Sequence, residues 1–209
     1  MLRTGLLTVA VALLAFVAAW WLTDDFRVWT AEGARRLEVV EHPVRAPAIR
    51  MLAPGDAGGT TLAALFDDDA GEPAIVDFIY TRCESVCSSL GSGFQQLQRT
   101  IAANTQDRVR LLSVSFDPAH DDTQALAGYA ARLHADARIW RFATPADARD
   151  LASLLAAYQV VVIPDGLGGY EHNAALLVID ARGRLVRIFD YSELDLALAY
   201  ARSLRRGDR

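Results

Sequence analysis

The sequence predicts an α/β fold, with helices on both faces of a central mixed sheet and a membrane-spanning helix at the N-terminus. Two observations predict the α/β fold. Apolar segments of strand character alternate along the chain with segments of helical spacing, which is the order of α/β layer folds. The last two strand candidates are separated by a short turn and pair as an antiparallel hairpin, so the sheet is mixed. A third observation, an uncharged N-terminal segment, predicts the membrane helix.

The N-terminal segment, residues 5–22, reads GLLTVAVALLAFVAAWWL and carries no charge. About 20 apolar residues cross a bilayer, and tryptophans such as Trp20 and Trp21 are frequent at the membrane interface. Residues 17–19 also fit a signal-peptidase site, but cleavage there would leave both tryptophans at the new N-terminus. We therefore expect residues 1–24 to be an uncleaved anchor or signal, with a cleaved signal peptide as the alternative.

Charge alone points weakly to the opposite orientation, because the arginines after the anchor outnumber the single Arg3 before it; they are Arg27, Arg35 and Arg36. A long C-terminal domain is translocated largely regardless of such charges. We expect a single-pass protein of the cell inner membrane, with its C-terminal domain on the exported, periplasmic side. In that oxidising compartment a thiol pair stays reduced only with a thiol reductant or a bound metal, so a reducing partner is expected.

The composition excludes several classes of function. The 209 residues carry a formal net charge of −5 and include no lysine, so Schiff-base and P-loop lysine chemistry are excluded. The arginines are scattered and outnumbered by carboxylates, so no basic stripe indicates nucleic-acid binding. A chain of this length fits one domain and an appendage.

Residues 25–50 are expected to form a stalk between the anchor and the domain, which we place at residues 51–209. A short helix is expected near residues 30–40 of the stalk, before two prolines. The first element of the domain is an edge strand or hairpin arm at residues 60–62, after a glycine-rich turn.

Five further segments have the apolar, β-branched character of strands. They are residues 74–80, 109–116, 138–142, 175–180 and 185–190. The last two pair as a hairpin around the turn at residues 181–184.

Four helices are expected between and after these strands. The first follows the two cysteines, and Asp121 or Asp122 caps the second. Thr144 followed by Pro145 predicts the start of the third, because a capping residue before proline is the preferred order. The fourth covers about residues 192–204.

Cys83 and Cys87 are the only cysteines in the sequence, and they follow directly on the apolar strand. If a helix begins at Cys83, the four-residue spacing places both sulfurs on one face, where they can hold one metal ion or close a disulfide. The positive end of the helix dipole favours thiolate over thiol and supports either role. A structural disulfide is the alternative, but loop closure stabilises least when the loop is short.

His172 lies in a glycine-rich segment, residues 163–173, between the third helix and the hairpin. In open α/β folds such loops lie at the sheet edge where the first strand-to-helix corner also lies, so we expect His172 near the cysteines. Two thiolates and one imidazole suit Cu(I), whereas zinc favours a fourth ligand, for which only Asp165 and Glu171 lie close in sequence. The alternative is a surface histidine without a ligand role.

Asp77 interrupts the apolar strand, where a carboxylate costs several kcal/mol unless it is paired or protonated. It either faces the polar end of the sheet or accepts a proton from a cysteine during thiol–disulfide exchange. His120, in the segment DPAHDD at residues 117–122, is a candidate for a second metal site, although loop and capping chemistry is the simpler interpretation.

Three segments together resemble the SCO/SenC family of membrane-anchored copper-binding proteins. They are VDFIYTRC at residues 76–83 with Cys87 beyond it, SVSFDP at residues 113–118, and GYEHN at residues 169–173. The resemblance extends from the anchor to about Tyr191. It implies a thioredoxin-like fold in which Cys83, Cys87 and His172 bind one copper ion, as Cu(I) or alternatively as Cu(II).

The resemblance also implies a function, because family members are implicated in building the copper centre of cytochrome c oxidase subunit II. We expect a copper metallochaperone whose partner is that subunit or a similar copper acceptor. The first alternative is a membrane-tethered thiol–disulfide reductase in which Cys83 attacks and Cys87 resolves. Asp77, six residues before Cys83 as in thioredoxin, supports this redox role. The second alternative is a copper-responsive or redox-sensing interaction protein that transfers no metal.

The sequence departs from the family pattern at three positions. Family members usually carry proline after each cysteine, where this chain has Glu84 and Ser88, and aspartate before the histidine, where it has Glu171. A carboxylate at Glu84 disfavours the thiolate and opposes the helix dipole. We therefore expect a copper affinity or reduction potential that differs from that of a typical member.

Overall fold

The computed structural model describes residues 2–23, 25–26, 28–66, 71–83 and 86–204. Glu84 lies outside these residues. For Cys87 and Ser88 the described part of the structure includes the helical backbone but not the side chains.

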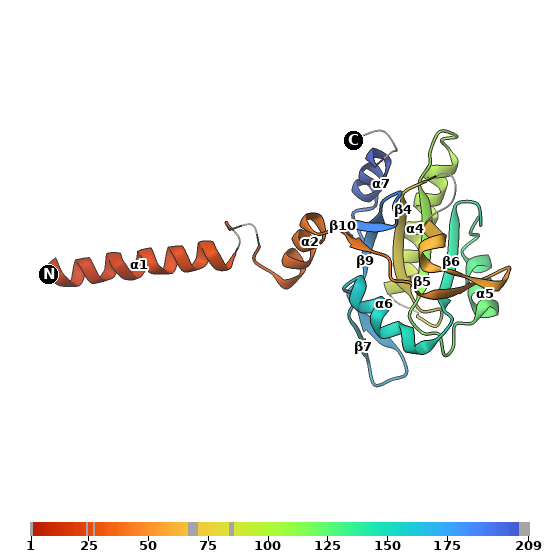
Figure 1. Ribbon diagram of the computed structural model, residues 1–209, viewed down its shortest axis with the longest axis horizontal. Helices are drawn as coiled ribbons and strands as arrows, with labels where there is room; N and C mark the ends of the chain where they lie inside the picture. The colour runs from red at the N-terminus through yellow and green to blue at the C-terminus, as the bar shows by residue number, and fades with distance from the viewer. Residues whose placement is uncertain (1, 24, 27, 67–70, 84–85, 205–209) are drawn as a thin grey trace.

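The N-terminal apolar segment forms one helix, α1 (Leu2–Leu22), that extends away from the rest of the chain (Figure 1). It is long and apolar enough to cross a membrane by length and composition, and none of its apolar window is buried against other parts of the protein. The helix is compatible with the predicted anchor and with a signal sequence.

The expected stalk is partly packed onto the domain. Helix α2 (Ala31–Glu41) is capped by the Thr30 side chain, and strand β1 (Val44–Arg45) pairs with strand β10 (Arg184–Asp190). Val39 is fully buried. The structure thus differs from the prediction of a stalk up to residue 50, because the apolar face of α2 is buried in the same core as the sheet.

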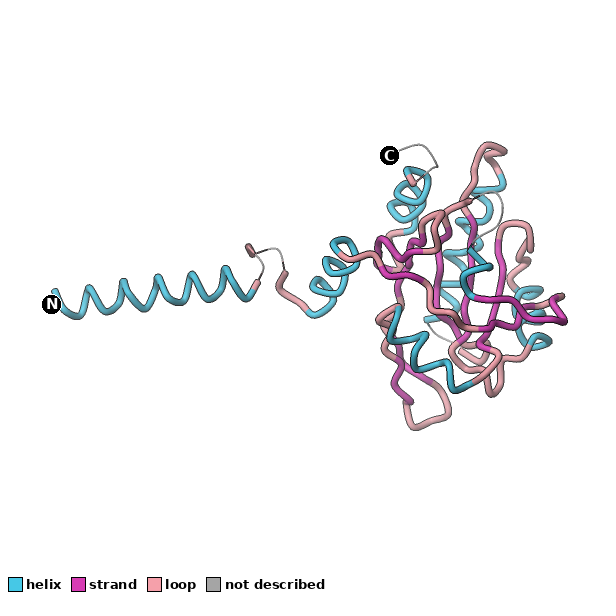
Figure 2. Tube along the Cα trace, viewed as in Figure 1, coloured by secondary structure: helices cyan, strands magenta, loops and turns pink. Residues whose placement is uncertain are grey.

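A mixed sheet lies at the centre of the domain (Figure 2). In the described part of the chain it has eight strands in the order β1-β10-β9-β4-β5-β6-β2-β3. Besides β1 and β10, the strands of this sheet are β2 (Arg50–Ala53), β3 (Asp56–Thr61), β4 (Ala74–Ile79), β5 (Arg110–Ser115), β6 (Trp140–Pro145) and β9 (Ala175–Ile179). Strands β4, β5 and β6 run parallel, and β9 pairs antiparallel with β4 and β10. Every residue of β4 is buried, which explains its nearly continuous apolar run.

Helices cover both faces of the sheet, as predicted. One face carries α4 (Val86–Ala102), α5 (Thr123–Arg132) and α7 (Leu194–Ser203), and the other carries α2, α3 (Leu62–Phe66) and α6 (Leu151–Ala157). Alternate residues of β4 divide between the two cores. Ile75 packs toward α4, and Val76 packs toward α6.

The third helix does not begin where the sequence predicts. Thr144 and Pro145 end β6, where they pair with β2. The chain then makes a 3₁₀ turn at Ala148–Asp150, capped by the Asp147 side chain, before α6 begins. The antiparallel pairing with β2 extends β6 over the expected cap, and Asp147 provides the N-terminal hydrogen bond instead.

The glycine-rich segment before the hairpin contains a second, smaller sheet. Strands β7 (Val162–Pro164) and β8 (Tyr170–His172) form an antiparallel ribbon in which His172 lies opposite Val162. The ribbon fixes the strand position of His172, which the sequence places only in a loop.

Candidate metal centre

Cys83 lies at the corner between β4 and α4, as expected, but it does not begin the helix. Its N–H donates to the Tyr80 carbonyl at 3.2 Å, so the segment after β4 makes a turn. The described helix begins at Val86, and Cys83 therefore precedes it. The expectation that both sulfurs lie on one helical face required a helix that begins at Cys83, and this condition is not met. Its side chain is half-buried and packs against the core that α6 covers.

The imidazole of His172 is buried at both of its nitrogen atoms. Both ring nitrogens are shielded from solvent, and neither has a hydrogen-bond partner among the described residues. Burial lowers the pKa of His172 and thereby favours the neutral imidazole, the form in which histidine binds metals. Buried polar atoms normally have partners, so these two nitrogens call for an explanation.

An aromatic cluster connects the corner of Cys83 with the ribbon of His172. The Tyr80 ring lies 5.4 Å from the Phe116 ring and 5.3 Å from the Tyr170 ring. The ring of Phe116 in turn meets the imidazole of His172 edge-on at 5.1 Å. Cys83 packs against the same apolar core as Tyr80 and Phe116. The cluster therefore links the segment that leads from β4 to Cys83 with the ribbon that carries His172.

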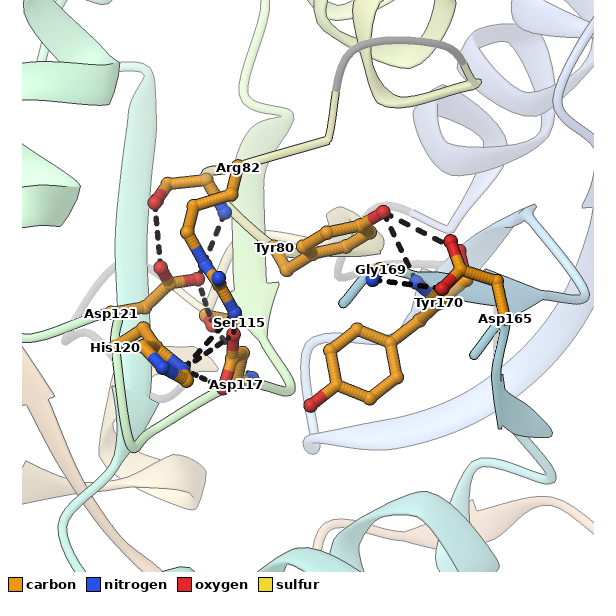
Figure 3. Close-up of polar contacts among 10 residues, drawn as sticks. Tyr80, Arg82, Ser115, Asp117, His120, Asp121, Asp165, Gly169 and Tyr170 are labelled. Atoms are coloured by element: carbon orange, nitrogen blue, oxygen red, sulfur yellow. Dashed lines mark hydrogen bonds and ion pairs between the residues drawn. The ribbon is translucent and has the colours of Figure 1, made fainter. Parts of the chain in front are cut away.

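A hydrogen bond fixes the ribbon to the end of β4. The N–H of Tyr170 donates to the hydroxyl of Tyr80 at 3.3 Å (Figure 3). Tyr80 is three residues before Cys83, and Tyr170 is two residues before His172. The Tyr80 hydroxyl also donates to the Tyr170 carbonyl at 3.5 Å, so two hydrogen bonds couple the backbone segments that carry the two candidate ligands.

The two carboxylates near His172 in sequence are Asp165, which accepts backbone hydrogen bonds, and Glu171, which is exposed. The Asp165 carboxylate accepts hydrogen bonds from the N–H groups of Leu167 and Gly169 at 2.7 and 2.9 Å, and these bonds lower its pKa. Glu171 is exposed and lies next to His172 in β8, so it points to the opposite side of the ribbon. Among the described residues, no group of three or more His, Cys, Asp and Glu could hold a metal ion; the sulfur of Cys87 lies outside them.

His120 belongs to an ion-pair cluster and not to a second metal site. Its Nδ1 lies 2.9 Å from Oδ1 of Asp117, and Arg82 donates to Oδ2 of Asp117 at 2.8 Å (Figure 3). Burial alone would raise the pKa of Asp117, but the hydrogen bonds from His120 and Arg82 outweigh it and hold that pKa below its usual value. Asp122 caps α5 by accepting from Ala125, which confirms one of the two predicted caps.

Asp77 is buried on the α4 side of the sheet. The side chain is 1% exposed, and neither oxygen has a hydrogen-bond partner among the described residues. It lies between Ile75 and Ile79, whose side chains pack with α4. Burial raises the pKa of Asp77 to about 7, so at neutral pH it both accepts and releases protons readily. The expectation that it faces the polar end of the sheet is not met.

Comparison with known proteins identifies the family. The SCO1/SenC family model matches residues 63–205. The chain belongs to the SCO1/SenC family. A curated relative of this SCO1/SenC chain is the SCO1 protein homolog of Bacillus subtilis, which is 27% identical over 127 residues; the match spans 60% of this chain and 64% of that protein.

Solved structures of SCO proteins share the fold. BsSco, described as a member of the Sco family of cytochrome c oxidase assembly proteins with a disulfide switch, superposes with a TM-score of 0.65 at 22% identity, over 78% of this chain and 94% of its own. Yeast Sco1, crystallised with copper bound, gives a TM-score of 0.64 at 15% identity, over 79% and 92%. The thioredoxin-like fold expected from the resemblance is thus confirmed for this SCO1/SenC protein.

Replacing Tyr80 by phenylalanine is expected to lower the free energy of unfolding by about 1–2 kcal/mol, because the N–H of Tyr170 loses its partner while the ring contacts remain. Denaturant unfolding of the reduced protein measures the loss, and hydrogen exchange over residues 165–172 reports the ribbon. The matched control is Tyr158→Phe. The Tyr158 hydroxyl is buried without a partner among the described residues, so its removal is expected to be neutral or stabilising. Equal losses in both variants would contradict the role given to Tyr80.

Proposed function

We propose that this SCO1/SenC protein is a membrane-anchored copper metallochaperone that holds one copper ion through Cys83, Cys87 and His172. One observation carries the proposal: both nitrogens of His172 are buried without partners among the described residues, at the sheet edge where Cys83 lies. Copper bound in yeast Sco1 supports the choice of metal.

The residue types suit a copper ion that the protein binds and then passes to an acceptor. Thiolates are soft ligands that select Cu(I), and a neutral imidazole completes a site with few ligands. Such a site leaves room for a ligand of an acceptor to approach the ion, so that one protein–copper bond forms as another breaks. Because burial lowers the pKa of His172, protons compete less with copper for its ring nitrogens.

The anchor and the relatives support the proposed location and acceptor. BsSco is a member of the Sco family of cytochrome c oxidase assembly proteins. We propose that subunit II of cytochrome c oxidase, or a similar copper acceptor, receives the copper. We place the domain on the periplasmic side of the inner membrane, held there by α1, with a thiol reductant that keeps Cys83 and Cys87 reduced. Anchoring in the same membrane confines donor and acceptor to one surface.

The proposal is tested by copper transfer. The full chain in detergent is loaded with one equivalent of Cu(I) and mixed with the copper-free soluble domain of a cytochrome c oxidase subunit II. Chromatographic separation and copper analysis then follow the metal. We expect the copper to move to the acceptor faster than from a small-molecule chelator that buffers the same free Cu(I). Equal rates from protein and chelator would contradict a chaperone role.

A second function, thiol–disulfide reduction of the acceptor, is favoured by Asp77. In this reaction the Cys83 thiolate attacks an acceptor disulfide, forms a mixed disulfide and releases one acceptor thiolate. The Cys87 thiolate then displaces the second acceptor thiolate and closes a disulfide with Cys83, which a dithiol reductant reopens. A buried carboxylate with a pKa of about 7 suits the acceptance of the Cys87 proton.

The two functions predict different behaviour of two variants. If the protein is a reductase, Cys87→Ser accumulates a mixed disulfide between Cys83 and an oxidised acceptor, visible on a non-reducing gel, and His172→Ala leaves the reaction rate unchanged. If it is a copper chaperone, copper transfer to the reduced acceptor depends on His172, and Cys87→Ser accumulates no mixed disulfide with the oxidised acceptor. If the mixed disulfide accumulates and copper transfer does not depend on His172, the reductase function replaces the chaperone proposal.

A further inference from the structure

We propose that Asp121 is a positioning residue for Cys83, an inference that rests on the proposed role of Cys83 as a copper ligand. The sequence marks Asp121 only as a candidate helix cap, but Asp122 fills that role. Asp121 is instead fully buried beneath the turn that carries the cysteine.

Three hydrogen bonds converge on the Asp121 carboxylate. Oδ2 accepts from the Thr81 N–H at 2.9 Å, and Oδ1 accepts from the Thr81 hydroxyl at 2.6 Å. The hydroxyl of Ser115, the last residue of β5, also donates to Oδ2, at 2.6 Å. Thr81 is two residues before Cys83, so the carboxylate holds both the main chain and the side chain of the turn.

A second carboxylate supports the first. The Asp117 N–H donates to the Ser115 hydroxyl at 3.0 Å, so one serine connects the two acids. Arg82, the residue next to Cys83, donates to the Asp117 carboxylate, which is 3% exposed. Residues 81 and 82 are thus each held by a buried acid of the loop between β5 and α5. This loop and the turn before Cys83 form one hydrogen-bonded unit.

The placement of these acids favours positioning over simple stabilisation of the fold. A buried carboxylate is costly unless several donors surround it, and here two of the three donors of Asp121 belong to the turn before Cys83. Hydrogen bonds that orient a metal ligand from outside the coordination sphere typically change metal affinity by about 10–100-fold. We therefore expect Asp121 to act on the copper affinity through the orientation of Cys83.

The test compares variants of the full chain in detergent. Asp121→Ala removes all three acceptor contacts. Thr81→Val removes one donor but keeps the charge of the acid, and Asp122→Ala is the neighbouring, exposed control. Two quantities are measured: Cu(I) affinity by competition with a chromogenic chelator, and the alkylation rate of Cys83 across pH in a Cys87→Ser background.

We expect Asp121→Ala to weaken Cu(I) binding by about 10–100-fold and to accelerate alkylation of Cys83, because the turn is released. Thr81→Val is expected to change both quantities in the same direction by less, and Asp122→Ala to change neither. Since Thr81→Val retains the Asp121 carboxylate, a change in affinity or alkylation rate in this variant reports the position of Cys83 and not a loss of charge. If Asp121→Ala fails to fold, the Thr81→Val variant alone tests the positioning role.

Two outcomes separate this inference from the proposed function. If wild type binds Cu(I) tightly and the folded Asp121 and Thr81 variants match it in affinity and alkylation, the positioning role is overturned and the chaperone proposal stands. If wild type does not bind Cu(I) tightly, the proposed function fails. The alkylation profiles then decide by themselves whether Asp121 positions Cys83.

Discussion

Replacing His172 by alanine is expected to weaken Cu(I) binding by more than about 100-fold. Loss of a group that only orients a metal ligand costs about 10–100-fold, and loss of the ligand itself exceeds that. The free energy of unfolding should change little, because the variant also removes two buried nitrogens without partners among the described residues and loses mainly the ring contact with Phe116. Competition with a chromogenic Cu(I) chelator, under anaerobic and reducing conditions, measures the affinity.

The matched control is His42→Ala, an exposed residue at the C-terminal end of α2. This variant should bind Cu(I) as wild type does. If His172→Ala retains wild-type affinity while remaining folded, His172 is not a ligand. Its buried nitrogens, which lack partners among the described residues, then no longer support the proposed function.

Asp77→Asn is expected to stabilise the reduced, metal-free protein at pH 8 by up to about 4 kcal/mol. Burial raises the pKa of Asp77 from 3.8 to about 7, and each unit of difference between the folded and unfolded states is equivalent to about 1.4 kcal/mol. Below pH 4 the carboxyl is protonated in both states and costs nothing extra. As pH rises from 4 to 7 the unfolded chain loses its proton first, so wild type becomes progressively less stable than the variant.

Denaturant unfolding at pH 5 and pH 8 measures this effect as the difference between variant and wild type. Burial lowers the pKa of His172, which gives a trend of opposite sign, but that trend is common to both proteins and cancels. Asp195→Asn, exposed in the first turn of α7, is the control and should shift stability by less than about 1 kcal/mol at either pH. A variant that differs from wild type equally at both pH values would show that Asp77 is already neutral or paired.

The parts of the fold that the sequence predicts are those with a strong local pattern. The buried strand β4 and the hairpin of β9 and β10 follow from apolar runs and a turn, and the Asp122 cap follows from its place before an apolar helix face. The errors concern segments whose state depends on distant partners. Thr144 and Pro145 are strand because β2 pairs with them, and Val39 is buried because α2 covers the sheet.

The residues of the candidate site also fall into those that the sequence identifies and those that it does not. Cys83 and His172 are recognisable from residue type and position, and the topology brings them to one edge of the sheet. Asp121 could not be found from its local sequence, because it resembles a capping residue and two of its three hydrogen-bond donors belong to Thr81, 40 residues earlier in the chain. The one available signal was the position of an acid in the loop that follows β5, a strand that neighbours β4.

The central claim is that one copper ion is held by two sulfurs and one histidine nitrogen. The most direct test is X-ray absorption at the copper edge, on the full chain in detergent loaded anaerobically with one equivalent of Cu(I). We predict two sulfur neighbours and one imidazole nitrogen around each copper, with the nitrogen contribution absent in His172→Ala. A spectrum with sulfur neighbours alone, unchanged in His172→Ala, would contradict the three-ligand site.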